Sequence, residues 1–227
     1  MKNIKEIKKL VESYLKEEKV VSFKSPKKNF VVMIGGPGSG KGYILSKYIN
    51  LNNYKVLNSD NFLELFAKSK GVDLSDSNQT AKLKKEYGTK FSDKITDFIK
   101  KFNPEKIDNI IYDTTGQHVE KIIDYIDILK KKGFNTTGVY VITDQNIALV
   151  RNQMRARKVP DDVLINIHKK IIENYDEYLK MFDNFWIVYN NESWEEFQGF
   201  LEKNFEGKVT KRTGDYIRYT DRIKKVK

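Results

Sequence analysis

The sequence contains no cysteine and is poor in several other residue types that often carry chemistry. Its 227 residues include two His, two Trp and four Pro. The absence of Cys excludes disulfide bonds, thiol catalysis and cysteine-based zinc sites. His118 and His168 lack the spacing of metal ligands, and we assign a function to neither.

Long apolar runs are also absent. No stretch of the sequence reaches the roughly 20 apolar residues that a membrane-spanning helix needs. The N-terminus alternates Lys with Ile and Leu, which differs from the continuous apolar core of a signal peptide. We therefore expect a cytoplasmic protein with no membrane contact.

Charge is abundant, but arginine is scarce. The net charge is +11, and its excess lies at the two ends, because residues 29–202 are neutral while residues 1–28 carry +5 and residues 203–227 carry +6. Basic ends can attract a phosphate backbone, so nucleic acid is one candidate partner. A Lys-rich composition of the whole chain explains the same charge without any partner, and we favour that interpretation.

Apolar runs and helical periodicity alternate along the chain. Runs typical of buried strands occupy 30–34, 54–57, 107–112, 137–142 and 185–189, and helical segments cover 41–50, 61–70, 79–102, 117–132, 144–156, 161–181 and 194–204. This alternation predicts an α/β fold with a parallel five-stranded sheet flanked by helices. An amphipathic helix at 3–19 and a β-hairpin at 208–219 are expected at the ends. We predict one domain over 1–227, with a basic helix at 1–28, a core at 29–204 and a basic extension at 205–227.

A glycine-rich stretch between the first strand and the first core helix fits a phosphate-binding loop. The pattern G-x-x-x-x-G-K runs from Gly35 to Lys41, after a five-residue apolar run and at the start of a helix. Such a loop cradles phosphate oxygens with its backbone amides, while the lysine reaches the β- and γ-phosphates. The predicted nucleotide-binding residues are Gly35, Gly36, Pro37, Gly38, Ser39, Gly40, Lys41, Gly42 and Tyr43. These features predict a P-loop NTPase-type fold that binds ATP or GTP.

The hydroxyl residue that normally follows the lysine is missing. Gly42 and Tyr43 stand where Ser or Thr would help to hold Mg²⁺. The metal must then depend on phosphates, water and a carboxylate elsewhere. Asp113 follows the third strand, as a magnesium-binding acid follows its strand in many P-loop proteins, so we assign it to the metal. A local turn or cap role is the alternative.

Asp60 is the second acid at a predicted strand end. In open α/β sheets the ligand lies beyond the carboxyl ends of the strands. Phosphoryl transfer to an alcohol needs a carboxylate that accepts the hydroxyl proton, and Asp60 is the candidate for this general base. The alternative is that Ser59 or Asp60 caps a helix that starts at Asn61.

Three of the six arginines fall within seven positions. Arg151, Arg155 and Arg157 are the only arginines between residues 29 and 202. The first two lie one helical turn apart, which predicts a shared face. Because arginine makes planar, multidentate phosphate contacts, we expect a lid that closes over the transferring group. A solvated basic helix face is the alternative.

The residues resemble the zeta-toxin and polynucleotide-kinase-like P-loop kinases over about residues 30–191. The matching pieces are Gly35–Lys41, Asn58–Asp60, Tyr112–Gly116, Tyr125–Lys131 with Gly133-Phe134, Val139–Val141 and, as the most specific, Ala148–Pro160 followed by the helix through His168. The resemblance implies transfer of a γ-phosphate to a hydroxyl acceptor, such as an activated amino sugar or a nucleic-acid 5′ end. It also implies that Asp60 is the general base, that Lys41 is the phosphate clamp and that the three arginines are lid contacts. An antitoxin-like partner is a further expectation.

Three functions therefore remain open. The first is a magnesium-dependent kinase that acts on a small hydroxyl acceptor such as a nucleotide sugar. The second is a polynucleotide or nucleotide kinase that acts on nucleic-acid ends. The third is a non-catalytic nucleotide-binding module, which Gly42 and Tyr43 motivate. Leu63-Glu64, where relatives often bring a basic residue to the acceptor, leaves the acceptor open.

Overall fold

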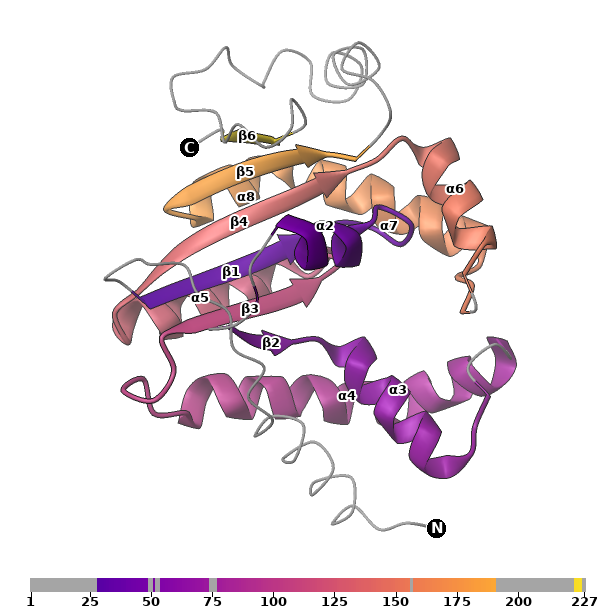
Figure 1. Cartoon of the computed structure of the whole chain (residues 1–227), viewed down its shortest axis with the longest axis horizontal. Helices are drawn as coiled ribbons and strands as arrows, with labels where there is room; N and C mark the ends of the chain where they lie inside the picture. Colours follow the sequence, from indigo (N-terminus) through magenta and orange to yellow (C-terminus); the bar gives the residue numbers. More distant parts are fainter. Residues whose placement is uncertain are drawn as a thin grey trace.

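A six-stranded sheet is the centre of the structure (Figure 1), a computed structural model that describes residues 28–48, 51, 54–73, 77–155, 157–190 and 223–225. The strands are β1 (Lys28–Ile34), β2 (Lys55–Leu57), β3 (Asn109–Thr114), β4 (Phe134–Ile142), β5 (Asn184–Tyr189) and β6 (Ile223–Lys225). The helices are α2 (Lys41–Tyr48), α3 (Ser59–Lys70), α4 (Ser77–Lys101), α5 (Val119–Lys131), α6 (Gln145–Gln153), α7 (Asp161–Glu173) and α8 (Tyr175–Met181). None of the described helices is long and apolar enough to cross a membrane.

The strand order β2-β3-β1-β4-β5-β6 places β1 in the middle of the sheet. Strands β1 to β5 are parallel, and β6 pairs antiparallel with β5. All five parallel strands therefore end at the same edge, towards which their arrows point in Figure 1. Ligands of open parallel sheets bind beyond this carboxyl edge.

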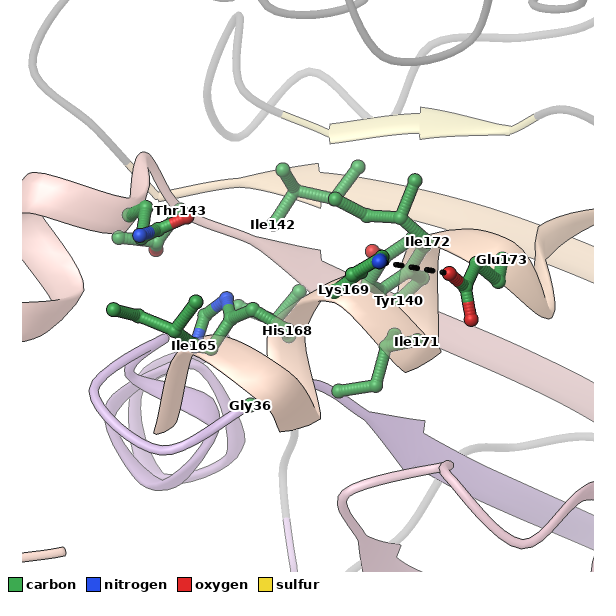
Figure 2. A pocket seen from close by; sticks show the side chains of 12 residues that line it. Gly36, Tyr140, Ile142, Thr143, Ile165, His168, Lys169, Ile171, Ile172 and Glu173 are labelled. Atoms are coloured by element: carbon green, nitrogen blue, oxygen red, sulfur yellow. Dashed lines mark ion pairs between the residues drawn. The ribbon is translucent and has the colours of Figure 1, made fainter. Parts of the chain in front are cut away.

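Helices cover the two faces of the sheet unequally. Among the described helices, α2 lies on one face, while α5, α7 and α8 lie on the other (Figure 1). Between α7 and the carboxyl half of β4 a pocket of about 370 Å³ remains (Figure 2). Four of its twelve lining residues are isoleucines, polar and charged side chains such as His168 and Lys169 also line it, and Gly36 of the glycine-rich loop forms part of its lining.

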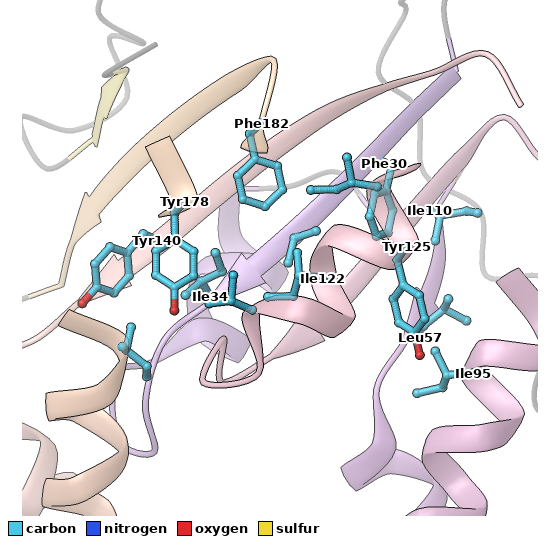
Figure 3. Packing of buried hydrophobic residues seen from close by; sticks show 14 of the residues in the cluster. Phe30, Ile34, Leu57, Ile95, Ile110, Ile122, Tyr125, Tyr140, Tyr178 and Phe182 are labelled. Atoms are coloured by element: carbon cyan, nitrogen blue, oxygen red, sulfur yellow. The ribbon is translucent and has the colours of Figure 1, made fainter. Parts of the chain in front are cut away.

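The larger core fills the face that carries α5 and α8 (Figure 3). Along β1, Phe30, Val32 and Ile34 face this core, and Val31 and Met33 face the smaller core under α2. Each such side chain, once fully buried, contributes about 1.5–3 kcal/mol of transfer free energy. Both faces of β1 are therefore apolar, as the continuous run in the sequence predicts for a central parallel strand.

The five predicted parallel strands are confirmed, and three details differ. The segment predicted as one helix over 161–181 is two helices, because Asn174 ends α7 and its side-chain amide donates to the Gln117 carbonyl. The helix predicted over 144–156 ends at Gln153. The antiparallel strand β6 extends the sheet beyond the predicted five strands. The predicted helices at 3–19 and 194–204 and the hairpin at 208–219 lie outside the described residues.

Candidate functional site

The loop between β1 and α2 has the backbone form of an anion-binding turn. Gly38 has a φ of 78°, a left-handed value that favours glycine, and a Cβ there would lie 2.3 Å from the Ala148 carbonyl oxygen. The Ser39 N–H donates to the Gly36 carbonyl at 3.1 Å, and α2 begins at Lys41. The loop amides and the helix N-terminus thus provide positive potential at the carboxyl edge. We call residues 35–42 the phosphate loop.

Two side chains at neighbouring strand ends hold the phosphate loop from outside. Thr143, directly after β4, donates from Oγ1 to the Ser39 carbonyl at 3.0 Å, and Asn190, directly after β5, donates from Nδ2 to the same oxygen at 2.8 Å. All three residues are buried. Because a carbonyl that points away from the anion still needs a donor, these contacts stabilise the loop shape without occupying its concave side.

A line of polar side chains joins α3 to the phosphate loop. The Asp60 N–H donates to Asn58 Oδ1 at 2.8 Å, and Asn58 Nδ2 donates to Asp113 Oδ2 at 2.7 Å. Asp113 Oδ1 lies 3.9 Å from Lys41 Nζ. The two acids and the lysine that the sequence singled out are therefore neighbours. The helix cap of α3 is Asn58, which corrects the alternative that Ser59 or Asp60 supplies it.

Burial shifts the pKa values of Lys41 and Asp113 in opposite directions. Desolvation lowers the pKa of the Lys41 ammonium, against the raising effect of the Asp113 and Asp60 carboxylates. Desolvation raises the pKa of Asp113, against the lowering effect of Lys41. Lys41 Nζ also donates to the Gly35 carbonyl at 2.6 Å. Burial thus opposes the charged form of both groups, and the attraction between them offsets part of this effect.

The available oxygens fit a magnesium ion that is shared with phosphates. Asp113 Oδ1 is buried and has no hydrogen-bond partner among the described residues. Mg²⁺ usually binds one or two carboxylates together with substrate phosphates and water. Gly42 offers no side-chain ligand, and Tyr43 is half exposed. No cluster of three or more His, Cys, Asp or Glu suited to a metal occurs in the described part of the chain, so the ion would depend on the nucleotide.

The three arginines predicted to form a lid approach the site at different points. Arg157 Nη2 donates to Asp60 Oδ2 at 2.6 Å, which connects the segment between α6 and α7 to α3. Arg151 Nη1 lies 3.4 Å from Thr143 Oγ1, beside the phosphate loop. Arg155 is exposed, and it is close enough to Lys41 to contribute to the lowering of its pKa.

The prediction that Arg151 and Arg155 share a helical face is wrong. Helix α6 ends at Gln153, and beyond it the backbone of Val159 is paired with the side chain of Asn152. Asn152 Nδ2 donates to the Val159 carbonyl at 2.7 Å, and the Val159 N–H donates to Asn152 Oδ1 at 3.0 Å. The buried side chain of Asn152 thus holds together the two ends of residues 153–160, which we call the arginine loop. Arg155 lies in this loop and not in helix α6.

Sequence reasoning missed several side chains that build the site. They are Asn58, Thr143, Asn152, His168 and Asn190. The sequence criterion for Asp60 and Asp113 is an acid near a predicted strand end. Extended to any polar side chain, this criterion also includes the asparagines and threonine that directly follow β2, β4 and β5. His168 and Asn152 lie on helices and carry no such signal.

The chain matches proteins of known families over most of its length. The profile of the zeta toxin family matches residues 11–197. A putative bifunctional polynucleotide phosphatase/kinase of Acanthamoeba polyphaga mimivirus is 25% identical over 164 residues, which are 68% of this chain and 32% of that protein. The chain therefore spans about a third of the length of this curated relative.

Solved structures share the fold at low sequence identity. A chain of the PezAT chromosomal toxin-antitoxin system of Streptococcus pneumoniae superposes with a TM-score of 0.62 at 16% identity, over 85% of this chain and 81% of that one. The AvrRxo1-ORF1:-ORF2 complex with ATP contains a chain that superposes with a TM-score of 0.68 at 16% identity, over 93% of this chain and 73% of that one. These likenesses concern the fold. Because the family profile covers most of its residues, the chain belongs to the zeta toxin family, and it is a phosphotransferase of the P-loop kinase type.

Proposed function

We propose that this protein transfers the γ-phosphate of ATP or GTP to a hydroxyl group of a small acceptor, such as a nucleotide sugar, with Mg²⁺. The observation that supports this proposal most is the series of polar contacts from Asp60 through Asn58 and Asp113 to Lys41. It sets a candidate proton acceptor beside a candidate phosphate site at the carboxyl edge of the sheet. Family membership supports the same chemistry.

Each member of the site then has one task. The amides of the phosphate loop and Lys41 would hold the β- and γ-phosphates, and Asp113 would hold a magnesium ion that offsets the negative charge of the phosphates. Asp60 accepts the proton of the acceptor hydroxyl as its oxygen attacks the γ-phosphorus and the bond to the β-γ bridging oxygen breaks. The three lid arginines stabilise the charge on the transferring group.

The first test replaces the proposed base. Asp60→Asn keeps the size of the side chain and removes its ability to accept a proton, so transfer should fall by about 10²- to 10⁴-fold while nucleotide affinity stays near that of the unsubstituted protein. Transfer is measured with γ-³²P-labelled ATP and GTP and a panel of nucleotide sugars, sugars and nucleosides. Nucleotide affinity is measured by calorimetry.

The matched control is Asp97→Asn on the exposed side of α4, where Asp97 pairs with Lys101 at the surface. This variant should transfer phosphate at the rate of the unsubstituted protein. Full transfer by Asp60→Asn would refute the assignment of the base. Tight nucleotide binding without transfer to any acceptor would instead favour the non-catalytic module.

A second candidate is a polynucleotide kinase. Two observations favour it, namely the similarity to the mimivirus protein and the basic ends of the chain. This function predicts phosphorylation of 5′-hydroxyl oligonucleotides. It also predicts binding that weakens by about one decade per decade of salt for each neutralised phosphate. Binding that does not depend on salt, or labelling confined to small acceptors, would exclude it.

An antitoxin-like partner is also part of the proposal. The PezAT system is described as a toxin-antitoxin system, and its likeness to this chain concerns the fold. If the chain acts as a toxin through phosphoryl transfer, its expression in a bacterial host should arrest growth, and Asp60→Asn should relieve the arrest. Equal arrest by both forms would separate toxicity from the proposed chemistry.

A further inference from the structure

His168, on α7, lies against the phosphate loop. Its ring projects from α7 towards Gly36 (Figure 2), where a Cβ would lie 2.2 Å from His168 Nε2. The same nitrogen is 2.9 Å from the Pro37 carbonyl oxygen. Only a glycine fits against the ring at this distance, so the loop and the imidazole are in direct contact.

The contact supplies a donor that the loop needs. When the amides of an anion-binding turn converge on the ligand, its carbonyls point outward and require partners of their own. Thr143 and Asn190 satisfy the Ser39 carbonyl, and His168 is the side chain placed at the Pro37 carbonyl. Burial lowers the pKa of His168 below its ordinary value, which favours the neutral ring, and neutral imidazole donates from one nitrogen only.

The position of His168 in the sequence connects the phosphate loop with the arginine loop. Helix α7 follows the arginine loop directly, and α6, which precedes that loop, places Ala148 against Gly38. Both helices that flank the arginine loop therefore touch the phosphate loop, α6 through a backbone carbonyl and α7 through the imidazole.

We propose that His168 is a positioning residue, which donates from Nε2 to the Pro37 carbonyl, fixes the phosphate loop in its nucleotide-binding shape and ties it to the helix that follows the lid arginines. The assignment rests on the proposed nucleotide site. It does not depend on the identity of the acceptor. The competing explanation is that the ring only fills space between α7 and Gly36.

The first experiment separates donation from packing. His168→Gln retains an N–H donor at a similar distance along the side chain, and His168→Leu retains apolar volume without a donor. The dissociation constant for a non-hydrolysable ATP analogue with Mg²⁺, measured by calorimetry, should rise about tenfold in His168→Leu, the effect of losing one hydrogen bond to a buried carbonyl. It should rise less than threefold in His168→Gln. His118→Leu, at an exposed position without a side-chain cap bond, should leave affinity unchanged.

The pocket of about 370 Å³ behind the ring permits a second, independent experiment. His168→Ala enlarges this pocket, and small ring molecules can then enter it. Imidazole should restore nucleotide affinity to His168→Ala at about pH 8. 1-Methylimidazole, which has similar volume but no N–H group when neutral, should not.

The outcomes separate the proposed role of His168 from the proposed function of the protein. Equal affinity of His168→Leu and the unsubstituted protein, or equal rescue by both imidazoles, would overturn the positioning role and leave the proposed function intact. Absence of nucleotide binding by the unsubstituted protein would overturn both. Melting temperatures of all variants, measured without nucleotide, show whether a loss of affinity reflects unfolding.

Discussion

At the scale of single residues, the proposed role of Asp60 as a base depends on its contact with Arg157. The guanidinium group occupies one carboxylate oxygen of Asp60 at 2.6 Å, and Arg157 Nη1 is buried without a hydrogen-bond partner within the described residues. An acceptor hydroxyl needs access to the same carboxylate. If Asp60 acts as the proposed base, Arg157 has to release this oxygen or share the carboxylate with the acceptor hydroxyl, and Arg157 Nη1 is then a donor for a phosphate oxygen.

Gly42 gives a prediction at the residue scale about the metal. A Cβ at this position meets no atom within 4 Å, so a serine fits without strain from neighbours. Gly42→Ser restores the hydroxyl that the loop pattern usually carries, and it should lower the Mg²⁺ concentration for half-maximal ATP binding by about three- to tenfold. Calorimetric titrations of ATP at a series of Mg²⁺ concentrations measure this effect.

Gly42→Ala is the matched control, because it adds the Cβ without the hydroxyl. Both variants should gain up to about 1 kcal/mol of stability from the loss of a helical glycine. Only the serine variant should change the dependence on Mg²⁺. Identical magnesium curves for both would mean that the ion does not lie next to residue 42.

His168 gives a second residue-scale prediction, on pH and stability. Its pKa is lowered by burial and by the Lys41 charge, while the bond to the Pro37 carbonyl opposes the shift. Below the ordinary pKa of 6.5 the unfolded chain binds a proton that the folded chain resists, so stability should decline as the pH falls from about 6.5 towards the folded pKa. Urea unfolding between about pH 5 and 8 should show this decline in the unsubstituted protein and in His118→Gln, and a smaller decline in His168→Gln. Equal slopes in all three would contradict the lowered pKa.

At the scale of elements, sequence patterns predicted strands better than they predicted the ends of helices. The run Phe30–Ile34 is continuous and apolar because β1 is covered on both faces, so its nature follows from composition alone. The ends of α6 and α7 depend on Asn152 and Asn174, whose side chains bond to carbonyls at Val159 and Gln117. Those partners are known only once the chain has folded, so no local pattern reveals them.

The same reason explains which site residues could be found. Lys41, Asp60 and Asp113 follow from a loop motif and from strand ends, which are local features. The contact of His168 with Pro37 joins residues 131 positions apart, and it depends on where α7 packs. The roles of the site residues remain predictions that the experiments above address.

The two hydrogen bonds between the Asn152 side chain and the Val159 backbone give a prediction at the scale of elements. Asn152→Ala removes both bonds from the buried Asn152 side chain to the backbone of Val159, which should cost about 1–3 kcal/mol and open the base of the arginine loop. Amide hydrogen exchange followed by NMR should show the Val159 N–H exchanging about tenfold faster or more, because its acceptor is gone. Transfer activity should fall, since the loop that carries Arg157 would no longer be fixed beside the site.

Gln153→Ala is the matched control, as Gln153 is exposed on the same helix and donates to the surface carboxylate of Asp161. The Val159 amide should keep its protection in this variant. Unchanged exchange in Asn152→Ala would show that the arginine loop is closed by other contacts.

At the scale of the whole molecule, the strand order gathers distant parts of the sequence at one edge. Ends of β1, β2, β3, β4 and β5 each contribute a residue to the site or its support, namely the phosphate loop, Asn58, Asp113, Thr143 and Asn190. A nucleotide at this edge would therefore bridge elements from both halves of the sheet. The free energy of nucleotide binding should therefore stabilise all of these elements together against unfolding.

Ligand-linked stability tests this view of the whole molecule. With Mg·ATP at about 100 times its dissociation constant, mass action adds about 2.7 kcal/mol, which corresponds to a rise in Tm of about 5–10 °C for a domain of this size. Lys41→Met removes the cation that faces both Asp113 and the expected phosphates, so the rise should disappear at the same ATP concentration. Lys101→Met, at an exposed ion pair on α4, should keep the full rise. Chelation of Mg²⁺ should reduce the rise in the unsubstituted protein, and a full rise in Lys41→Met would place the nucleotide away from the phosphate loop.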